Sequence, residues 1–125
     1  MTTRYLVALA SEIPPGSCKV VEAGGRTVGV YNIGGSFFAL RNVCPHQGAE
    51  LCKGLQTAYV AGGQPGEFVY EREKEIVRCP WHQWEFDIKT GVMVVDKRMR
   101  TKCYEVTVEK YDVTLEDQQV FVHME

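Results

Sequence analysis

The chain has 125 residues, of which 45% are hydrophobic and 24% charged, so it has room for one globular domain with its own core. Its 14 basic and 16 acidic side chains give a formal net charge of -2, which argues against nucleic acid as the main partner because phosphate binding needs a clustered basic surface. No apolar run approaches the roughly 18 residues of a membrane span, and no export signal is evident. We therefore expect a cytoplasmic protein that is not attached to a membrane.

The first third of the chain predicts short antiparallel strands joined by tight turns. Tyr5, Val7 and Leu9 alternate with other residues as the inward positions of a half-buried strand would. The glycine pairs 24–25 and 34–35 separate β-prone runs, which is typical of hairpins because such turns need positive φ. The strands expected around these turns are Cys18–Glu22, Arg26–Asn32 and Phe37–Asn42.

The rest of the chain continues this pattern. A hairpin is expected from Phe68–Arg72 into Glu75–Arg78, and a turn at Lys89-Thr90-Gly91 is expected to return Trp84–Ile88 into Val92–Val95. The last expected strands are Tyr104–Lys110, Val113–Leu115 and Val120–Met124, with a turn at 117–119. No segment has a sustained helical period with caps. The sequence therefore predicts an all-β fold, an antiparallel sandwich or small barrel.

Two stretches interrupt the strands and carry the candidate chemistry. The first reads Cys44-Pro45-His46 and the second Cys79-Pro80-Trp81-His82, with residues 47–78 between them. Each offers one thiolate and one imidazole, and each meets a proline directly after the cysteine. Because proline fixes φ and removes a hydrogen-bond donor, both stretches favour rigid loops over continued strands.

Two cysteines and two histidines can hold either one tetrahedral zinc ion or one two-iron, two-sulfur cluster. Structural zinc sites usually place two to five residues between paired ligands, so the Cys-x-His spacing is tight for a single ion. It fits better if the two ligands of each loop bind different metals. In that arrangement Cys44 and Cys79 hold one iron, and His46 and His82 hold the other.

The two motifs together resemble those of the Rieske [2Fe-2S] proteins, most of all the ferredoxins that serve bacterial ring-hydroxylating oxygenases. The resemblance extends over most of the chain and implies a single Rieske domain over residues 1–125. It also implies a two-loop cluster-binding subdomain, with loops at about 43–54 and 78–87, at one tip of an all-β fold. The cofactor it implies is one [2Fe-2S] cluster on Cys44, His46, Cys79 and His82.

This sequence departs from the high-potential members of that family. Ala49 and Trp81 stand where those proteins carry two further cysteines joined as a disulfide. Trp84 and Phe86 stand where they place a serine and a tyrosine hydroxyl near the cluster. Neither residue can donate an O–H bond to a sulfur, so we expect a midpoint potential at the low end of the class range of roughly -150 to +300 mV.

The segment between the two motifs is about twice as long as is usual in the family. We place the surplus between Leu55 and Lys74, with an exposed loop at 61–66 and an added strand at Phe68–Arg72. A tolerated insertion is the favoured interpretation, and a docking rim beside the cluster is the alternative.

The remaining cysteines and the third histidine are expected to have no part in the chemistry. Cys18 and Cys103 fall in strand-like segments as small buried side chains, and Cys52 is expected to pack in its loop near the cluster. His123 lies in the last expected strand without a partner motif. With only three histidines in the chain, a mononuclear iron site beside the cluster would lack ligands.

The function expected from this resemblance is one-electron transfer without bond chemistry, so the chain itself is not an enzyme. It would accept an electron from a flavin-dependent ferredoxin reductase and pass it to a terminal oxygenase or a similar redox enzyme. The alternatives are a small iron–sulfur subunit of a nitrite-reductase-like or oxygenase complex and a structural Cys2His2 zinc domain.

Overall fold

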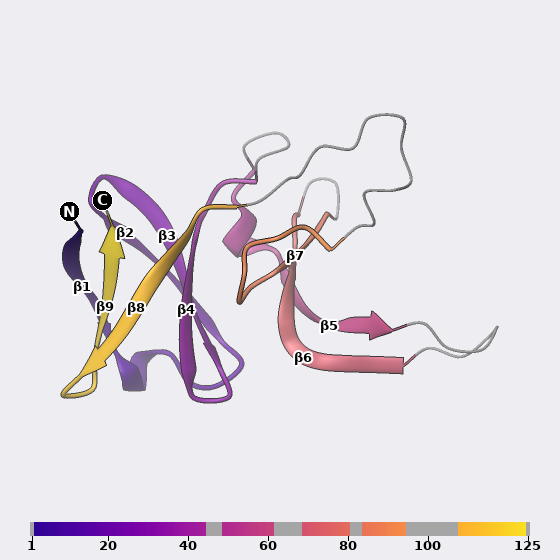
Figure 1. Cartoon of the computed structure of the whole chain (residues 1–125), viewed down its shortest axis with the longest axis horizontal. Helices are drawn as coiled ribbons and strands as arrows, with labels where there is room; N and C mark the ends of the chain where they lie inside the picture. The colour runs from indigo at the N-terminus through magenta and orange to yellow at the C-terminus, as the bar shows by residue number, and fades with distance from the viewer. Residues whose placement is uncertain (1, 45–48, 62–68, 81–83, 95–107, 125) are drawn as a thin grey trace.

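The computed structural model describes residues 2–44, 49–61, 69–80, 84–94 and 108–124, with only the backbone described for 59–61 and 69–72 (Figure 1). Its elements confirm the all-β prediction. Two 3-10 helices of three residues each, η1 (Ala10–Glu12) and η2 (Leu51–Lys53), are the only helices in these ranges. None of the helices in the described part of the chain could cross a membrane.

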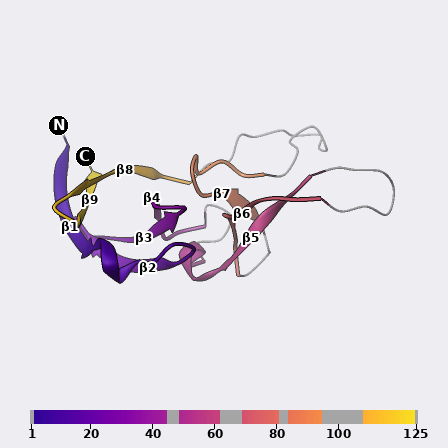
Figure 2. The same cartoon turned by 90° about the horizontal axis from the view of Figure 1, so that it is seen from below.

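The larger sheet has six strands and curves back on itself (Figures 1 and 2). Its order is β1-β9-β8-β4-β3-β2, and every paired neighbour is antiparallel. The edge strands β1 and β2 also contact each other, so the sheet is almost a closed barrel. The strands are β1 (Thr3–Leu9), β2 (Cys18–Ala23), β3 (Arg26–Ile33), β4 (Ser36–Arg41), β8 (Lys110–Glu116) and β9 (Gln119–Met124).

The hairpin turns of the barrel are where the sequence predicts them. Gly24 and Gly25 have φ of 58° and 78°, and Gly34 and Gly35 have φ of 60° and 94°. The last turn uses Asp117 and Gln118, both also at positive φ. Two successive residues at positive φ match the right-handed twist of the strands they join, so all three turns continue the barrel without splaying it.

One detail of β1 differs from the prediction. The register of β1 against β9 shifts between Leu6 and Ala8, so the strand contains a bulge at Val7. The bulge reverses the alternation of faces, and Ala8 is buried while Leu9 is 48% exposed. Tyr5 and Val7 are half-buried as predicted, but the expectation that Leu9 follows them inward is wrong.

The smaller sheet has three strands, β5 (Leu55–Ala61), β6 (Val69–Arg78) and β7 (Glu85–Asp87), in the order β5-β6-β7. The predicted hairpin from Phe68–Arg72 into Glu75–Arg78 is wrong, because 69–78 form one bent strand (Figure 1). Lys74 has a φ of 66°, and the register against β5 shifts where Thr57 faces Ile76 but Tyr59 faces Glu71. The positive φ therefore belongs to a bulge, not to a turn.

The end of the chain agrees with the prediction in part. The turn at Lys89–Gly91 returns β7 to residues 92–94, with bonds from Asp87 N–H to the Val92 carbonyl (2.8 Å) and from Gly91 N–H to the Asp87 carbonyl (2.7 Å). Residues 104–107 of the predicted strand Tyr104–Lys110 lie outside the described residues. Lys110 begins β8, which continues unbroken to Glu116, so the predicted break before Val113 is wrong.

Strands β3 and β4 are buried on both faces and separate two cores. Val28 and Val30 of β3 and Ala39 of β4 point into the barrel, and Tyr31 and Leu40 point to the opposite side. We call the interior the barrel core and the opposite side the cluster-side core. The cluster-side core contains Tyr31, Leu40, Cys44, Ala49, Leu51, Cys52, Val77, Cys79, Phe86, Ile88 and Val108.

Candidate functional site

Two loops with the same closure bring the predicted cysteines into the cluster-side core. Cys44 follows β4, and its N–H donates to the carbonyl of Ala49 at 2.7 Å. Cys79 follows β6, and its N–H donates to the carbonyl of Trp84 at the same distance. Both cysteines are 1% exposed. In each motif a backbone hydrogen bond therefore joins the buried cysteine to the residue five positions later.

A close backbone approach joins the first loop to the second. Gly54 ends η2, and Leu55 pairs with Arg78, the residue before Cys79. A Cβ built on Gly54 would lie 1.7 Å from the Arg78 carbonyl oxygen, so only glycine allows this approach. The exit of the first loop is thereby packed against the entry of the second.

Apolar side chains surround the two thiols and keep water from them. Ala49 and Phe86 are 2% and 0% exposed, and the partly buried Trp84 packs against the same core. At the base of the second loop Arg78 Nη2 lies 3.4 Å from Glu85 Oε2, and the two residues face each other across β6 and β7. The low polarity of these surroundings disfavours added negative charge, so it lowers the midpoint potential of a redox centre bound to the two thiols.

Cys18 and Cys52 form a separate pair between the barrel and the first loop. Both sulfurs lie within 3.4 Å of the point where a Cβ on Gly29 would stand, and Cys52 Sγ bonds to the Leu40 carbonyl at 3.7 Å. Burial raises the pKa of Cys18 to about 12, with a further contribution from Cys52, and burial raises the pKa of Cys52 to about 11. Both thiols therefore stay protonated at neutral pH, as expected of packing residues.

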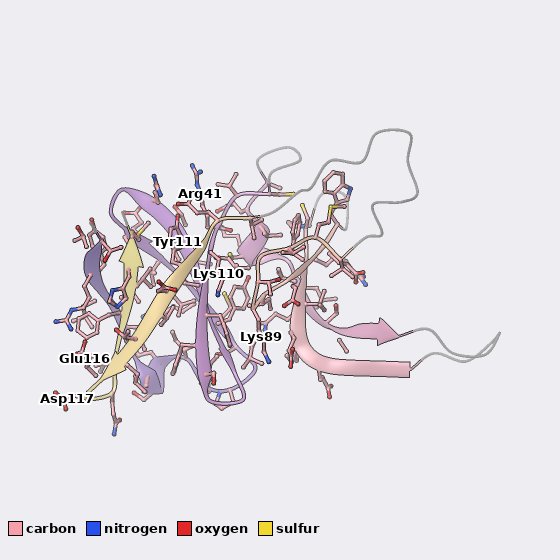
Figure 3. The ribbon with its side chains drawn as sticks, in the orientation of Figure 1. Arg41, Lys89, Lys110, Tyr111, Glu116 and Asp117 are labelled. Atoms are coloured by element: carbon pink, nitrogen blue, oxygen red, sulfur yellow. The ribbon has the colours of Figure 1, made fainter. Side chains whose placement is uncertain are left out.

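Lys89 links the barrel to the small sheet (Figure 3). Lys89 Nζ lies 3.4 Å from Glu75 Oε1 of β6 and 5.9 Å from the ring centroid of Phe38 of β4. Gly91 makes a second link, because its carbonyl accepts a 2.7 Å bond from Val108 N–H just before β8. These contacts fix the small sheet against the outer face of β3 and β4.

Among the residues that the sequence analysis singles out, His46, Trp81, His82 and Cys103 lie outside the described residues. The described ranges hold no group of three or more potential metal ligands. The third histidine, His123, is in β9, and its Nε2 lies 2.9 Å from Thr114 Oγ1 of β8. His123 is therefore hydrogen-bonded on the barrel and pairs in register with Arg4 and Asp112.

The donor set fits an iron–sulfur cluster on the chemistry of the described residues. Two buried thiols stand at equivalent positions of two matched loops, in an apolar core, with no disulfide between them. Soft thiolate ligands and an apolar shell are what Fe–S clusters require. The family comparison decides between this cofactor and zinc: residues 3–112 match the model of the Rieske [2Fe-2S] domain.

The chain belongs to the Rieske [2Fe-2S] domain family. The match confirms the predicted cofactor, one [2Fe-2S] cluster, and the predicted fold class. The match does not identify individual ligands, so Cys44, His46, Cys79 and His82 remain predicted ligands.

Full-length relatives agree with this assignment. The chain is 30% identical over 127 residues to the ferredoxin component of the naphthalene 1,2-dioxygenase system of Pseudomonas aeruginosa, with 99% of each chain covered. The ferredoxin of carbazole 1,9a-dioxygenase from Nocardioides aromaticivorans IC177 superimposes with a TM-score of 0.71, at 27% identity and 96% coverage of both chains. A putative NADPH nitrite reductase small subunit has a TM-score of 0.65 at 20% identity, covering 96% of this chain and 97% of its own, which shows a shared fold alone.

Sequence reasoning missed several residues that shape the site. Gly54 and Gly29 matter because other chain segments approach them, and no local pattern reveals such contacts. Asn42 is buried two residues before Cys44, and its Oδ1 accepts a 2.7 Å bond from Cys52 N–H. A polar residue two positions before a ligand motif is the one signal that the sequence offers.

Proposed function

We propose that this Rieske domain, over residues 1–125, is a one-electron carrier whose [2Fe-2S] cluster is held by Cys44, Cys79, His46 and His82. When bound, the cluster supplies a reversible one-electron couple. The observation that carries the proposal is the matched pair of loops, each closed by a 2.7 Å bond and each presenting a buried cysteine to one core. A cluster with two cysteine ligands on one iron and two histidine ligands on the other needs matched loops, because each loop supplies one ligand to each iron.

The described residues have distinct tasks in this proposal. Cys44 and Cys79 would hold one iron of the cluster, and the backbone bonds to Ala49 and Trp84 fix the two ends of each loop. A fixed shape lowers the reorganisation that accompanies a change of charge. Phe86 excludes water from the thiolate side and cannot donate a hydrogen bond, which supports a midpoint potential at the low end of the class range.

We further propose that the electron comes from a flavin-dependent ferredoxin reductase and goes to a terminal oxygenase or similar redox enzyme. The support is the likeness over nearly the whole chain to ferredoxin components of dioxygenase systems. In this role the chain does no bond chemistry, and it is not an enzyme. His123, the one histidine that the cluster would not use, is hydrogen-bonded to Thr114 on the barrel and has no part in a second metal site.

The ligand assignment is tested by replacing one cysteine at a time and measuring iron, sulfide and visible absorbance of the purified protein. Cys44→Ser and Cys79→Ser should each lose the cluster, since metal binding is linked to the fold of the loops. Cys52→Ser is the matched control, because Cys52 is buried in the same core but is not a proposed ligand. A full cluster in either loop variant, or its loss in Cys52→Ser, would contradict the assignment.

The carrier role is tested by mixing the reduced protein with a Rieske oxygenase and following reoxidation in a stopped-flow instrument. Single-exponential reoxidation whose rate rises with oxygenase concentration is the expected result. Reoxidation no faster than by dissolved oxygen alone, with each of several oxygenases, would favour the alternative of a subunit built into another complex.

A further inference from the structure

Two asparagines are the buried polar residues of the described chain, and they differ in how their amides are used. Asn32 is 5% exposed and satisfied at both ends: its Nδ2 donates to the Ile13 carbonyl at 2.7 Å, and its Oδ1 accepts from Gly35 N–H at 2.9 Å. Asn32 lies at the hairpin end of β3, where it fixes the turn.

Asn42 is 3% exposed, and only the oxygen of its side-chain amide has a hydrogen-bond partner. Its Oδ1 accepts the 2.7 Å bond from Cys52 N–H at η2. Its backbone N–H donates to the Thr27 carbonyl of β3 at 2.9 Å. Its Nδ2 is buried, and no described residue accepts a hydrogen bond from it. A buried amide donor without an acceptor costs about 1–3 kcal/mol, so a partner for it is strongly favoured.

The place of Asn42 limits what that partner can be. Asn42 opens the first loop two residues before Cys44, and its side chain is bonded to η2, the segment through which the same loop returns. Among the described residues, Tyr31 and Thr57 also carry a buried polar atom that lacks a hydrogen-bond partner, and neither directly precedes a cluster loop in the chain. The amide of Asn42 therefore stands at the base of the first loop, with its Nδ2 donor group still without an acceptor.

We propose that Asn42 is a positioning residue of the cluster site: its amide oxygen ties the base of the first loop to η2, and its Nδ2 donates a hydrogen bond to the loop or to the cluster that the loop holds. The proposal rests on the proposed electron-carrier function. In either case the donor supports the base of the loop that holds the cluster. Loss of the donor should then loosen the cluster more than it loosens the fold.

The test compares Asn42→Leu with Asn32→Leu, because both variants replace a buried asparagine by a neutral side chain of similar size. The holoproteins are reconstituted, and three quantities are measured: the thermal unfolding midpoint of the barrel, the rate of cluster loss well below that midpoint, and the electron paramagnetic resonance spectrum after reduction. Both variants are expected to unfold earlier. Asn42→Leu alone is expected to lose its cluster at least tenfold faster and to show altered g-values.

A conservative variant sharpens the assignment. Asn42→Asp keeps an oxygen that can accept from Cys52 N–H but replaces Nδ2 by a second oxygen. Because its carboxylate is buried without a cation, it should unfold earlier than the wild type and lose its cluster at least as fast as Asn42→Leu. A lower midpoint potential in the uncharged Asn42→Leu variant would identify a cluster sulfur as the acceptor, and an unchanged potential would identify a loop carbonyl.

If Asn42→Leu and Asn32→Leu lose their clusters at equal rates and keep the wild-type spectrum, Asn42 is only a structural residue and the inference is wrong. If the wild-type protein itself binds no iron, the proposed function fails instead, so the two failures are distinguishable.

Discussion

The two faces of β3 and β4 serve different parts of this molecule. On the barrel side, the strands pair in an unbroken register through β2, β3 and β4 and turn at glycine pairs. On the cluster side, the register of β5 and β6 shifts, β6 ends at the residue before Cys79, and the chain approaches itself at Gly54 and Gly29. Regular pairing builds the scaffold, and irregular backbone supported on it positions the site.

The largest effect is expected at Gly54, where the exit of the first loop packs against the entry of the second. In Gly54→Ala the new Cβ would stand 1.7 Å from the Arg78 carbonyl oxygen, which is backbone and cannot move without shifting Cys79. We expect a loss of about 3 kcal/mol in unfolding free energy, together with loss of the cluster. Urea unfolding and iron content measure the two effects.

Gly25→Ala is the matched control for that variant. No atom lies within 4 Å of its Cβ, but its φ of 78° remains unfavourable, so we expect a loss of about 1–2 kcal/mol with a full cluster. If both alanine variants keep their iron, the close approach at Gly54 does not position the loops.

A smaller effect is expected at the boundary between the two regions. Gly29→Ala places a Cβ 2.3 Å from Cys52 Sγ and 2.5 Å from Cys52 Cβ, and η2 must move to admit it. We expect a destabilisation of about 1–3 kcal/mol, measured by urea unfolding. In an open strand the same change would stabilise by roughly 0.5–1 kcal/mol, so the sign of the result decides whether η2 packs on β3 as described.

The same boundary should make the protein sensitive to alkali. Folding raises the pKa of Cys18 from 9.0 to about 12 and that of Cys52 from 9.0 to about 11, chiefly by burial. Because both thiols ionise more readily in the unfolded chain, their contribution to stability is complete below pH 9 and is lost as the pH rises from about 9 to about 12.

The check is the unfolding free energy of the apoprotein between pH 8 and 11, for the wild type and for the double variant Cys18→Ser, Cys52→Ser. The decline with pH should be shallower in the double variant. Parallel curves would mean that these thiols are not shielded by the fold.

The smallest expected effect lies on the barrel surface, far from the site. Glu12 accepts a 2.7 Å bond from Leu9 N–H and a 3.1 Å bond from Lys19, and these contacts lower its pKa. A lowered pKa stabilises the fold above the pKa of the unfolded chain, and this contribution disappears as the pH falls. Glu12→Gln should therefore flatten slightly the loss of stability between pH 6 and 3, without a change in iron content. Identical unfolding curves for the variant and the wild type across this range would show that the pair contributes nothing.

The sequence predicts the scaffold better than the site for a physical reason. Hairpins at glycine pairs 24–25 and 34–35 depend on local backbone preference, which is readable from neighbouring residues. The bulges at Val7 and Lys74 depend on which face meets a core, so the predictions for Leu9 and for a hairpin at 68–78 fail. Cys44 and Cys79 were found from their motifs, whereas Asn42 and Gly54 depend on contacts with distant segments.

The most direct test of the account is the low-temperature electron paramagnetic resonance spectrum of the reduced wild-type protein, recorded with pulsed detection of nitrogen couplings. Ligation by Cys44, Cys79, His46 and His82 predicts one paramagnetic centre per chain, strongly coupled to two imidazole nitrogens. A reduced cluster without nitrogen couplings, or a colourless protein with stoichiometric zinc, would contradict the account.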